Sequence, residues 1–406
     1  MDLADLAKRK TRSLTVRGER TLALWNLQLT ATARLRAVGG LTMDRIRRQS
    51  LNFVQAMRMP EHGLGRYRYA PSQGDPVLYA SIYAVLIRHL YGDLLSLSDG
   101  ERREWAAYIA SYQTDDGLFR DPLIAGALAE NLDWWGTRHL TLHALMAIAA
   151  LDATAPKPIN FLESYYDPAR LVVWLEELDW GAYPGSADTC NVVQNVGTLL
   201  QYARDFQMVP EADASARTLF AWLDMHMDPV RGTWTQGGGT HFSDTVLVVN
   251  SYHLWCLYFY ERRRLPFKGM VDLLLSTQRW PGRFGPELNS SACDDIDAID
   301  PIARICCLAD YRRDEITASL NLALPWVLLN RHQDGGYVFK RGVPFTYGHS
   351  RMSSHRNESA MFPTWFRTLS LAYIAQALPD SFVAQQDWHF LPCPGHQFWL
   401  VDGTRT

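Results

Sequence analysis

Apolar positions along this chain fall into pairs of helix-like runs, and a short turn signal separates the two runs of each pair. The signal is a glycine, one further residue and an aromatic, and it recurs at 117–119, 181–183, 232–234, 282–284 and 335–337. Glycine provides the backbone freedom that the end of a helix requires. Each copy therefore predicts a helix, a tight turn and a second helix.

The spacing of these turns indicates a repeat architecture. Successive turn glycines lie 50 to 64 residues apart, a period typical of stacked units that cannot bury their apolar faces alone. The first runs are 104–112, 169–178, 218–225, 270–277 and 320–330, and the second runs are 138–151, 191–206, 245–260, 302–311 and 360–377. A sixth pair fits at the front, where the run 77–90 is apolar on nearly all faces and so belongs inside a layered structure. Six hairpins predict an all-α fold, an (α/α)6 toroid in which the second helix of each pair lines the centre.

Three segments follow from this pattern. We expect residues 1–74 to form an N-terminal helical arm and cap, residues 75–380 the α/α-toroid domain, and residues 381–406 a C-terminal extension that wraps the outside of the toroid. No low-complexity linker interrupts the chain.

Composition excludes several classes of function. The formal net charge of −3 argues against a nucleic-acid-binding surface. No apolar run is long enough to cross a bilayer, and residues 1–20 lack the apolar stretch of a secretory signal, so we expect a cytoplasmic protein. A peripheral membrane contact is left open. The six cysteines show no CxxC or Cys/His zinc spacing, so we expect no metal site of that kind.

The densest group of candidate catalytic residues is the Asp cluster, formed by Asp294, Asp295, Asp297 and Asp300. A helix N-terminus accounts for one or two carboxylates, but four would repel one another and raise their pKa values. A carboxyl kept neutral in this way can act as a general acid, whereas an ionised cluster could hold Mg²⁺. We therefore expect Asp294, Asp295 and Asp297 to be catalytic, with no cofactor or with Mg²⁺.

The remaining candidates lie where the other repeats enter their second helix. The residues expected to bind substrate are Trp134, Trp135, His139, Asp188, His241, Asp244, Arg356, Glu358, Trp365 and Arg367. Arginine is rarely buried unless it is paired, so we expect Arg367 to meet a carboxylate, with the Asp cluster as the candidate partner. Several aromatic faces around a cavity would stabilise carbocations or stack on sugar rings.

Three of the glycine turns have a glutamine before them, at 113–119, 278–284 and 333–337. These turns resemble the glutamine–tryptophan repeat of an α/α-toroid superfamily. That superfamily includes squalene–hopene cyclases, class II diterpene cyclases and protein prenyltransferase β subunits. The resemblance covers roughly residues 75–377. It implies an isoprenoid substrate and a carboxylic acid that protonates it. The cyclase motif Asp-x-Asp-Asp is replaced here by Asp294-Asp295-Ile296-Asp297, and the zinc ligands of the prenyltransferases are not matched.

Three functional hypotheses follow. The first is a terpenoid cyclase or isomerase in which the Asp cluster transfers a proton inside an aromatic-lined central cavity. The second is an (α/α)6 carbohydrate-active enzyme, a lyase, hydrolase or epimerase. Its acids and bases would be Asp188, His241, Glu358 and the Asp cluster, and its sugar platforms Trp134, Trp135 and Trp365. The third is a non-catalytic scaffold that binds a peptide, a glycan or a lipid.

Overall fold

A computed structural model describes residues 41–125, 135–237, 240–287 and 289–399. The chain divides into residues 1–42 and residues 43–406, and the second unit contains all the elements below. Among the described residues, none of the helices combines the length and the apolar character that a bilayer crossing requires.

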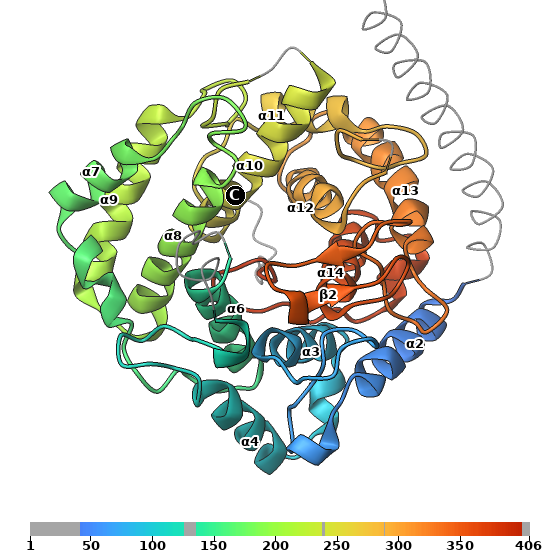
Figure 1. The fold of residues 1–406 in the computed structure, drawn as a ribbon. Helices are drawn as coiled ribbons and strands as arrows, with labels where there is room; N and C mark the ends of the chain where they lie inside the picture. The colour runs from blue at the N-terminus through green and yellow to red at the C-terminus, as the bar shows by residue number, and fades with distance from the viewer. Residues whose placement is uncertain (1–40, 126–134, 238–239, 288, 400–406) are drawn as a thin grey trace, which may run out of the picture. The chain divides into compact units, whose positions relative to one another are not determined.

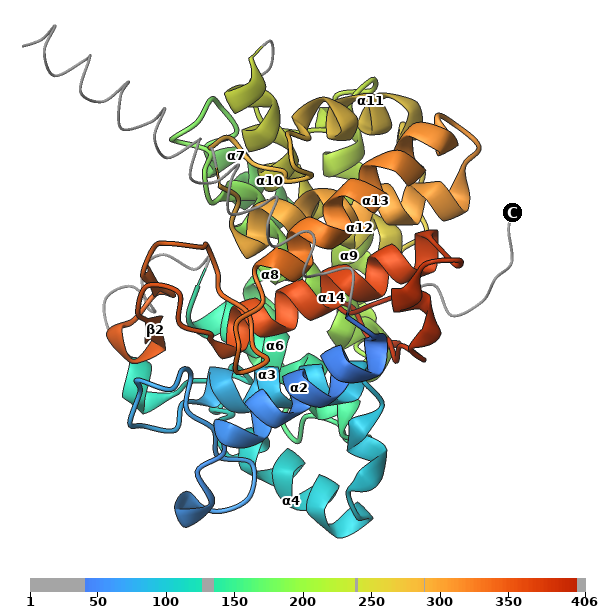
Figure 2. The ribbon, with the colours of Figure 1, turned by 90° about the vertical axis from the view of Figure 1, so that its right-hand side faces the viewer.

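Six inner helices form a closed ring (Figure 1). They are α3 (Leu78–Leu90), α6 (Thr137–Ala150), α8 (Thr189–Phe206), α10 (His241–Tyr260), α12 (Ala292–Leu308) and α14 (Met361–Ala377). Each packs against the next in this order, and α14 packs back against α3. Figure 2 shows this closure, with α14 lying between α13 and α2.

The outer helices are α2 (Met43–Ala56), α4 (Asp99–Ala110), α7 (Pro168–Glu177), α9 (Pro210–His226), α11 (Phe267–Thr277) and α13 (Arg313–Leu329). Each precedes an inner helix in the chain. All except α7 pack against inner helices, and α7 packs against α9. The predicted (α/α)6 toroid is therefore confirmed, and the second helix of each pair is the inner one.

The connections contain short elements. The 3₁₀ helices are η1 (Pro60–His62), η2 (Asp93–Ser96), η3 (Pro122–Ile124), η4 (Asn160–Tyr165), η5 (Ser350–Met352) and η6 (Phe382–Gln385). Strands β1 (Phe345–Thr346) and β2 (Ser353–Ser354) pair antiparallel between α13 and α14. Some helices begin with a polar capping side chain: Ser291 caps α12 by accepting from the backbone N–H of Asp294 at 3.1 Å.

The glycine turns join neighbouring hairpins. Gly117, Gly282 and Gly335 have φ angles of +84°, +124° and +94°. A Cβ on Gly282 would lie 2.0 Å from the carbonyl oxygen of Leu322 on α13. A Cβ on Gly335 would lie 2.1 Å from that of Gln49 on α2. These positions therefore require glycine because its backbone lies directly against the next outer helix.

The aromatic residue of each of these turns is held by its own inner helix. The backbone N–H groups of Phe119 and Tyr337 donate to the hydroxyls of Thr141 and Thr364, at 2.8 and 3.0 Å. In the third turn the equivalent acceptor is a carboxylate oxygen of Asp295, 3.1 Å from the backbone nitrogen of Phe284. Asp295 thus takes the place that a threonine holds in two other repeats.

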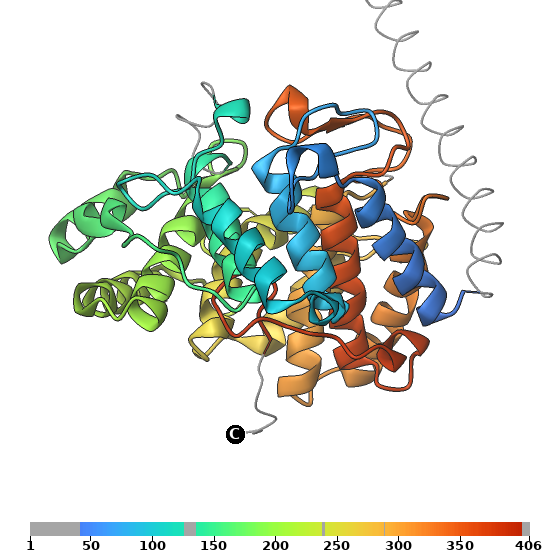
Figure 3. The same ribbon diagram turned by 90° about the horizontal axis from the view of Figure 1, so that it is seen from below.

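The chain after η6 runs back across the ends of the inner helices (Figure 3). We expected residues 381–406 to wrap the outside of the ring, but His396 and Gln397 are buried among side chains of the inner helices. The aromatic and polar composition of this segment is suited to the interior, where ring stacking and hydrogen bonds satisfy it.

Candidate functional site

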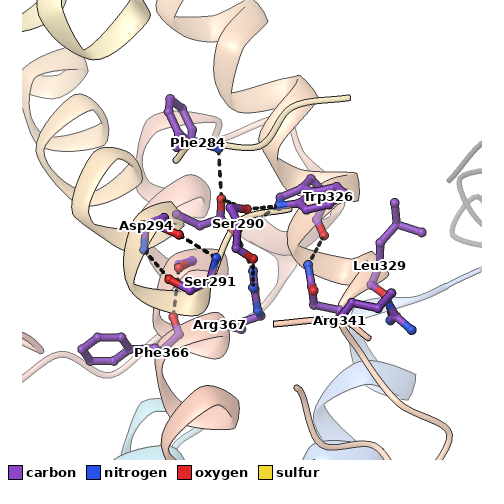
Figure 4. A network of polar contacts seen from close by, with 12 residues as sticks. Phe284, Ser290, Ser291, Asp294, Trp326, Leu329, Arg341, Phe366 and Arg367 are labelled. Atoms are coloured by element: carbon purple, nitrogen blue, oxygen red, sulfur yellow. Dashed lines mark hydrogen bonds and ion pairs between the residues drawn. The ribbon is translucent and has the colours of Figure 1, made fainter. Parts of the chain in front are cut away.

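The Asp cluster lies on α12, and its members have different environments. A carboxylate oxygen of Asp295 lies 2.6 Å from Nη1 of Arg367, and both side chains are buried. Its other contacts are donated by Ser290 Oγ at 2.7 Å and by Trp326 Nε1 at 3.0 Å (Figure 4). The expected pairing of Arg367 with the cluster is confirmed, and it satisfies the carboxylate of Asp295 completely.

Two further members of the cluster are also engaged. Asp294 accepts from the backbone N–H of Ser291 at 2.8 Å and so completes the capping box of α12. Asp300 lies 2.5 Å from Nε of Arg304 and accepts from the hydroxyl of Tyr252 at 3.1 Å. Both carboxylates serve local structure.

Asp297 differs from the rest of the cluster. Its side chain is 2 % exposed, and it makes no hydrogen bond or ion pair with any described residue. Burial, followed by the nearby charges of Asp294, Asp300 and Asp295, raises the pKa of Asp297 well above its usual value. Burial therefore favours the protonated form of this carboxyl group, which is the form that can donate a proton.

One face of the inner helix α10 is open. Phe242, at its start, is 51 % exposed, and Val246, Val249 and His253 follow at helical spacing, each partly exposed. The neighbouring helix α12, by contrast, is buried without interruption from 295 to 306. A solvent-accessible stripe thus leads from the start of α10 down to His253.

One ring nitrogen of His253 has no hydrogen-bond partner among the residues that the structure describes. Its Nδ1 lies 2.9 Å from the carbonyl oxygen of Val249, and a carbonyl can only accept, so Nδ1 carries the proton. Its Nε2 therefore has an available lone pair. Burial lowers the pKa of His253 to about 4, which keeps the ring neutral at pH 7. His396 stacks on Tyr252, the residue before His253, with ring centroids 5.7 Å apart.

The opposite wall of the interior is aromatic. Tyr83 on α3 stacks on Trp365 of α14, with ring centroids 5.3 Å apart, and meets His143 of α6 edge to face at 5.8 Å. His396 lies below them, 5.8 Å from His143 and 5.7 Å from Phe366. The interior is therefore aromatic toward α3, α6 and α14, and carries the acid and the imidazole on α12 and α10.

Several sequence-predicted residues belong to this wall. Trp135 is buried against Tyr79 with ring centroids 5.4 Å apart, and His139 shares a hydrogen bond of 2.7 Å with the hydroxyl of Tyr79. Trp365 donates from Nε1 to Oε1 of Gln397 at 2.8 Å. The structure brings these residues together, although it assigns them mainly to packing.

The other predicted residues are dispersed. The carboxylate of Glu358 accepts from the backbone N–H of Ser72 at 2.7 Å, from the Ser72 hydroxyl at 2.8 Å and from the backbone N–H of His355 at 2.6 Å. Glu358 therefore links two loops. Asp244 lies 3.6 Å from Nη1 of Arg231. Asp188 precedes α8 without capping it, and Arg356 is exposed. Trp134 and the side chain of His241 lie outside the described residues.

Sequence reasoning missed His253 and His396. The signal for His253 was a single histidine within the apolar run 245–260, a position that more often indicates a packed core residue. Nothing near His396 in the sequence indicates that it enters the ring. For Mg²⁺, no group of three or more potential ligands gathers among the described residues, and a magnesium ion at the Asp cluster stays an untested prediction.

Comparison with known proteins yields little. No family model matches the chain, and no curated protein matches it. Among solved structures, the chain is similar to a crystal structure of a family 76 glycoside hydrolase from a bovine Bacteroides thetaiotaomicron strain. The two share 10 % sequence identity and a TM-score of 0.45 over 84 % of this chain and 79 % of the other. A likeness this distant carries no argument about activity.

The expected membership of the terpenoid cyclase and prenyltransferase superfamily is wrong. No family model matches the chain, and a solved structure to which it is similar is a glycoside hydrolase. The structure adds a physical reason, because Asp295, in the segment that replaces the cyclase motif, is held in a buried ion pair with Arg367. The isoprenoid substrate is withdrawn with it.

Proposed function

We propose that this chain is an (α/α)6 carbohydrate-active enzyme that works by acid–base proton transfer, with Asp297 as the acid and His253 as the base. The proposal depends on a buried carboxyl on α12 that has no hydrogen bond or ion pair among the described residues and whose pKa is raised by burial. It lies on the helix next to α10, whose partly exposed face ends at an imidazole nitrogen that also has no hydrogen bond within the described part of the chain. The members of the Asp cluster that are paired take no part in it.

The chemistry follows from the two protonation states. A neutral carboxylic acid can donate to an oxygen that leaves or develops charge, and a neutral imidazole can accept a proton from the substrate. The pair suits a lyase, a hydrolase or an epimerase, since each of these moves protons to and from sugar atoms.

The entrance fits a saccharide. Tyr183 and Phe242 are each 51 % exposed, and their rings meet edge to face with centroids 5.7 Å apart. Exposed aromatic faces pack against the C–H faces of sugar rings. Asn191, near the start of α8, is partly exposed, and its buried side-chain oxygen has no hydrogen-bond partner among the described residues.

The non-catalytic scaffold is less favoured. That hypothesis is favoured if the Asp cluster is fully paired with Arg138, Arg356 or Arg367 and no cavity is left. Asp297 has no such partner in the described part of the chain, and a buried acid without one is costly unless it is used.

The test is turnover of a saccharide panel by the wild-type protein and matched variants. The panel contains mannan, xylan, starch, pectin, alginate and hyaluronan. The reaction is measured by the appearance of new reducing ends and by the absorbance of unsaturated uronates. We expect Asp297→Asn and His253→Gln each to lower turnover at least about 100-fold. The control is Asp310→Asn, whose side chain is 95 % exposed. Turnover that survives in Asp297→Asn, or no turnover by the wild-type protein, would contradict the proposal.

A further inference from the structure

The C-terminal tail, residues 391–399, enters the ring of inner helices. His396 is buried there, with its ring 5.8 Å from His143 on α6, 5.7 Å from Tyr252 on α10 and 5.7 Å from Phe366 on α14. A side chain that touches three helices on different sides of a ring must lie inside that ring.

The next two residues reach the remaining sides. Gln397 accepts from Trp365 Nε1 on α14 at 2.8 Å and donates to the carbonyl oxygen of Leu86 on α3 at 3.3 Å. The carbonyl oxygen of Phe398 accepts from Arg304 on α12 at 2.6 Å. The tail thus reaches α3, α6, α10, α12 and α14, so it spans the interior from wall to wall.

The fit leaves little space around the tail. Gly395 has a φ of +135°, and a Cβ there would lie 2.4 Å from Sδ of Met146 on α6. On the far side, the guanidinium of Arg304 lies over the ring of Phe398 at 5.8 Å and over that of Tyr373 at 5.1 Å. The tail is therefore packed against the walls as core, and no polymer strand can pass beside it.

We infer that the tail closes the interior and makes the site a dead-end pocket that takes chain ends or short saccharides. The inference rests on the proposed function. The floor lies close to the reacting groups, because His396 stacks on Tyr252, the neighbour of His253, and Tyr252 also holds Asp300, one turn beyond Asp297. A sugar that reaches this pair abuts the floor, so the attached chain extends only toward the entrance.

The closure is tested without any substrate by labelling a thiol. Cys256 is 9 % exposed, and its Sγ lies 3.9 Å from Nδ1 of His396. N-ethylmaleimide modification of Cys256, followed by peptide mass spectrometry, is expected to be at least about 10-fold faster in His396→Ala than in the wild-type protein. The matched control is His389→Ala, a histidine just before the tail whose side chain is one-third exposed. Equal rates in wild type and His396→Ala would overturn the closure.

The substrate class is tested on the unaltered protein, so it does not depend on a variant that folds. With the polysaccharide turned over in the panel, we expect terminal units to be released while viscosity stays high. A fall in viscosity before terminal release would mean internal attack and would overturn the chain-end inference while the proposed function stood. If no saccharide is turned over, the proposed function fails and the chain-end substrate fails with it. The thiol rates still decide the closure.

Discussion

The guanidinium of Arg367 lies 2.6 Å from the carboxylate of Asp295, and neither side chain is reached by solvent. Arg367 also donates to the backbone oxygen of Phe339 at 3.1 Å. The pair therefore links α14 to the start of α12 and to the segment that enters α14. A carboxylate that the sequence suggested as catalytic is a fastening point of the ring.

Breaking this pair is expected to destabilise the protein strongly. Asp295→Ala leaves the Arg367 charge buried without a partner, which typically costs about 3–5 kcal/mol of unfolding free energy. Urea unfolding followed by circular dichroism measures it. Replacing both residues together, Asp295→Leu with Arg367→Met, should recover much of the loss. A single variant as stable as the wild-type protein would show that the pair is not buried.

Asp297→Asn, in contrast, is expected to gain stability relative to the wild-type protein as the pH rises. The pKa of Asp297 is raised in the folded state, so the folded protein keeps this proton at a pH at which the unfolded chain has released it. The free energy of unfolding therefore falls as the pH rises above about 4, the pKa of the unfolded chain. The asparagine variant lacks this penalty. Its stability relative to the wild-type protein should therefore grow between pH 4 and pH 7, by up to about 1.4 kcal/mol per pH unit. A difference independent of pH would mean that Asp297 is ionised in the fold.

His143 should limit stability in acid. Burial lowers its pKa to about 4, against about 6.5 for an exposed histidine, so the unfolded state binds the proton first. Its contribution is present above pH 6.5 and is lost as pH falls toward 4. His143→Gln should lose less stability than the wild-type protein between pH 6.5 and pH 5 in thermal melts. Parallel losses in both proteins would contradict the assigned pKa.

Gly282 is expected to tolerate no side chain. Its φ of +124° strains any other residue, and a Cβ would also lie 2.0 Å from the carbonyl oxygen of Leu322. Gly342 provides a matched control, with a φ of +79° and no atom within 4 Å of the added Cβ. Gly342→Ala should cost about 1 kcal/mol, the strain alone, and Gly282→Ala clearly more. Equal losses in chemical denaturation would mean that the turn does not pack against α13.

The ring was predictable because its determinants are local. Each turn needs a glycine for its backbone conformation, as Gly282 and Gly335 show. The apolar composition of an inner helix such as α14 predicts that it is buried. The repetition then predicts the ring, because six similar hairpins can pack in few arrangements other than a closed ring.

The site was less predictable because it depends on distant partners. Four aspartates within one short segment look equivalent in the sequence. They are distinguished only by what faces them, such as Arg367, 72 positions away from Asp295. His253 was hidden in the same way, because its role depends on a hydrogen bond at Nδ1 and on the opening along α10.

Gln397 donates to an oxygen of Leu86, 311 positions earlier, so the floor of the pocket is joined to α3 only after the chain between them has been made. A chain cut before residue 391 would hold a ring with an open base. Closure of the interior therefore depends on a contact between segments that lie far apart in the sequence.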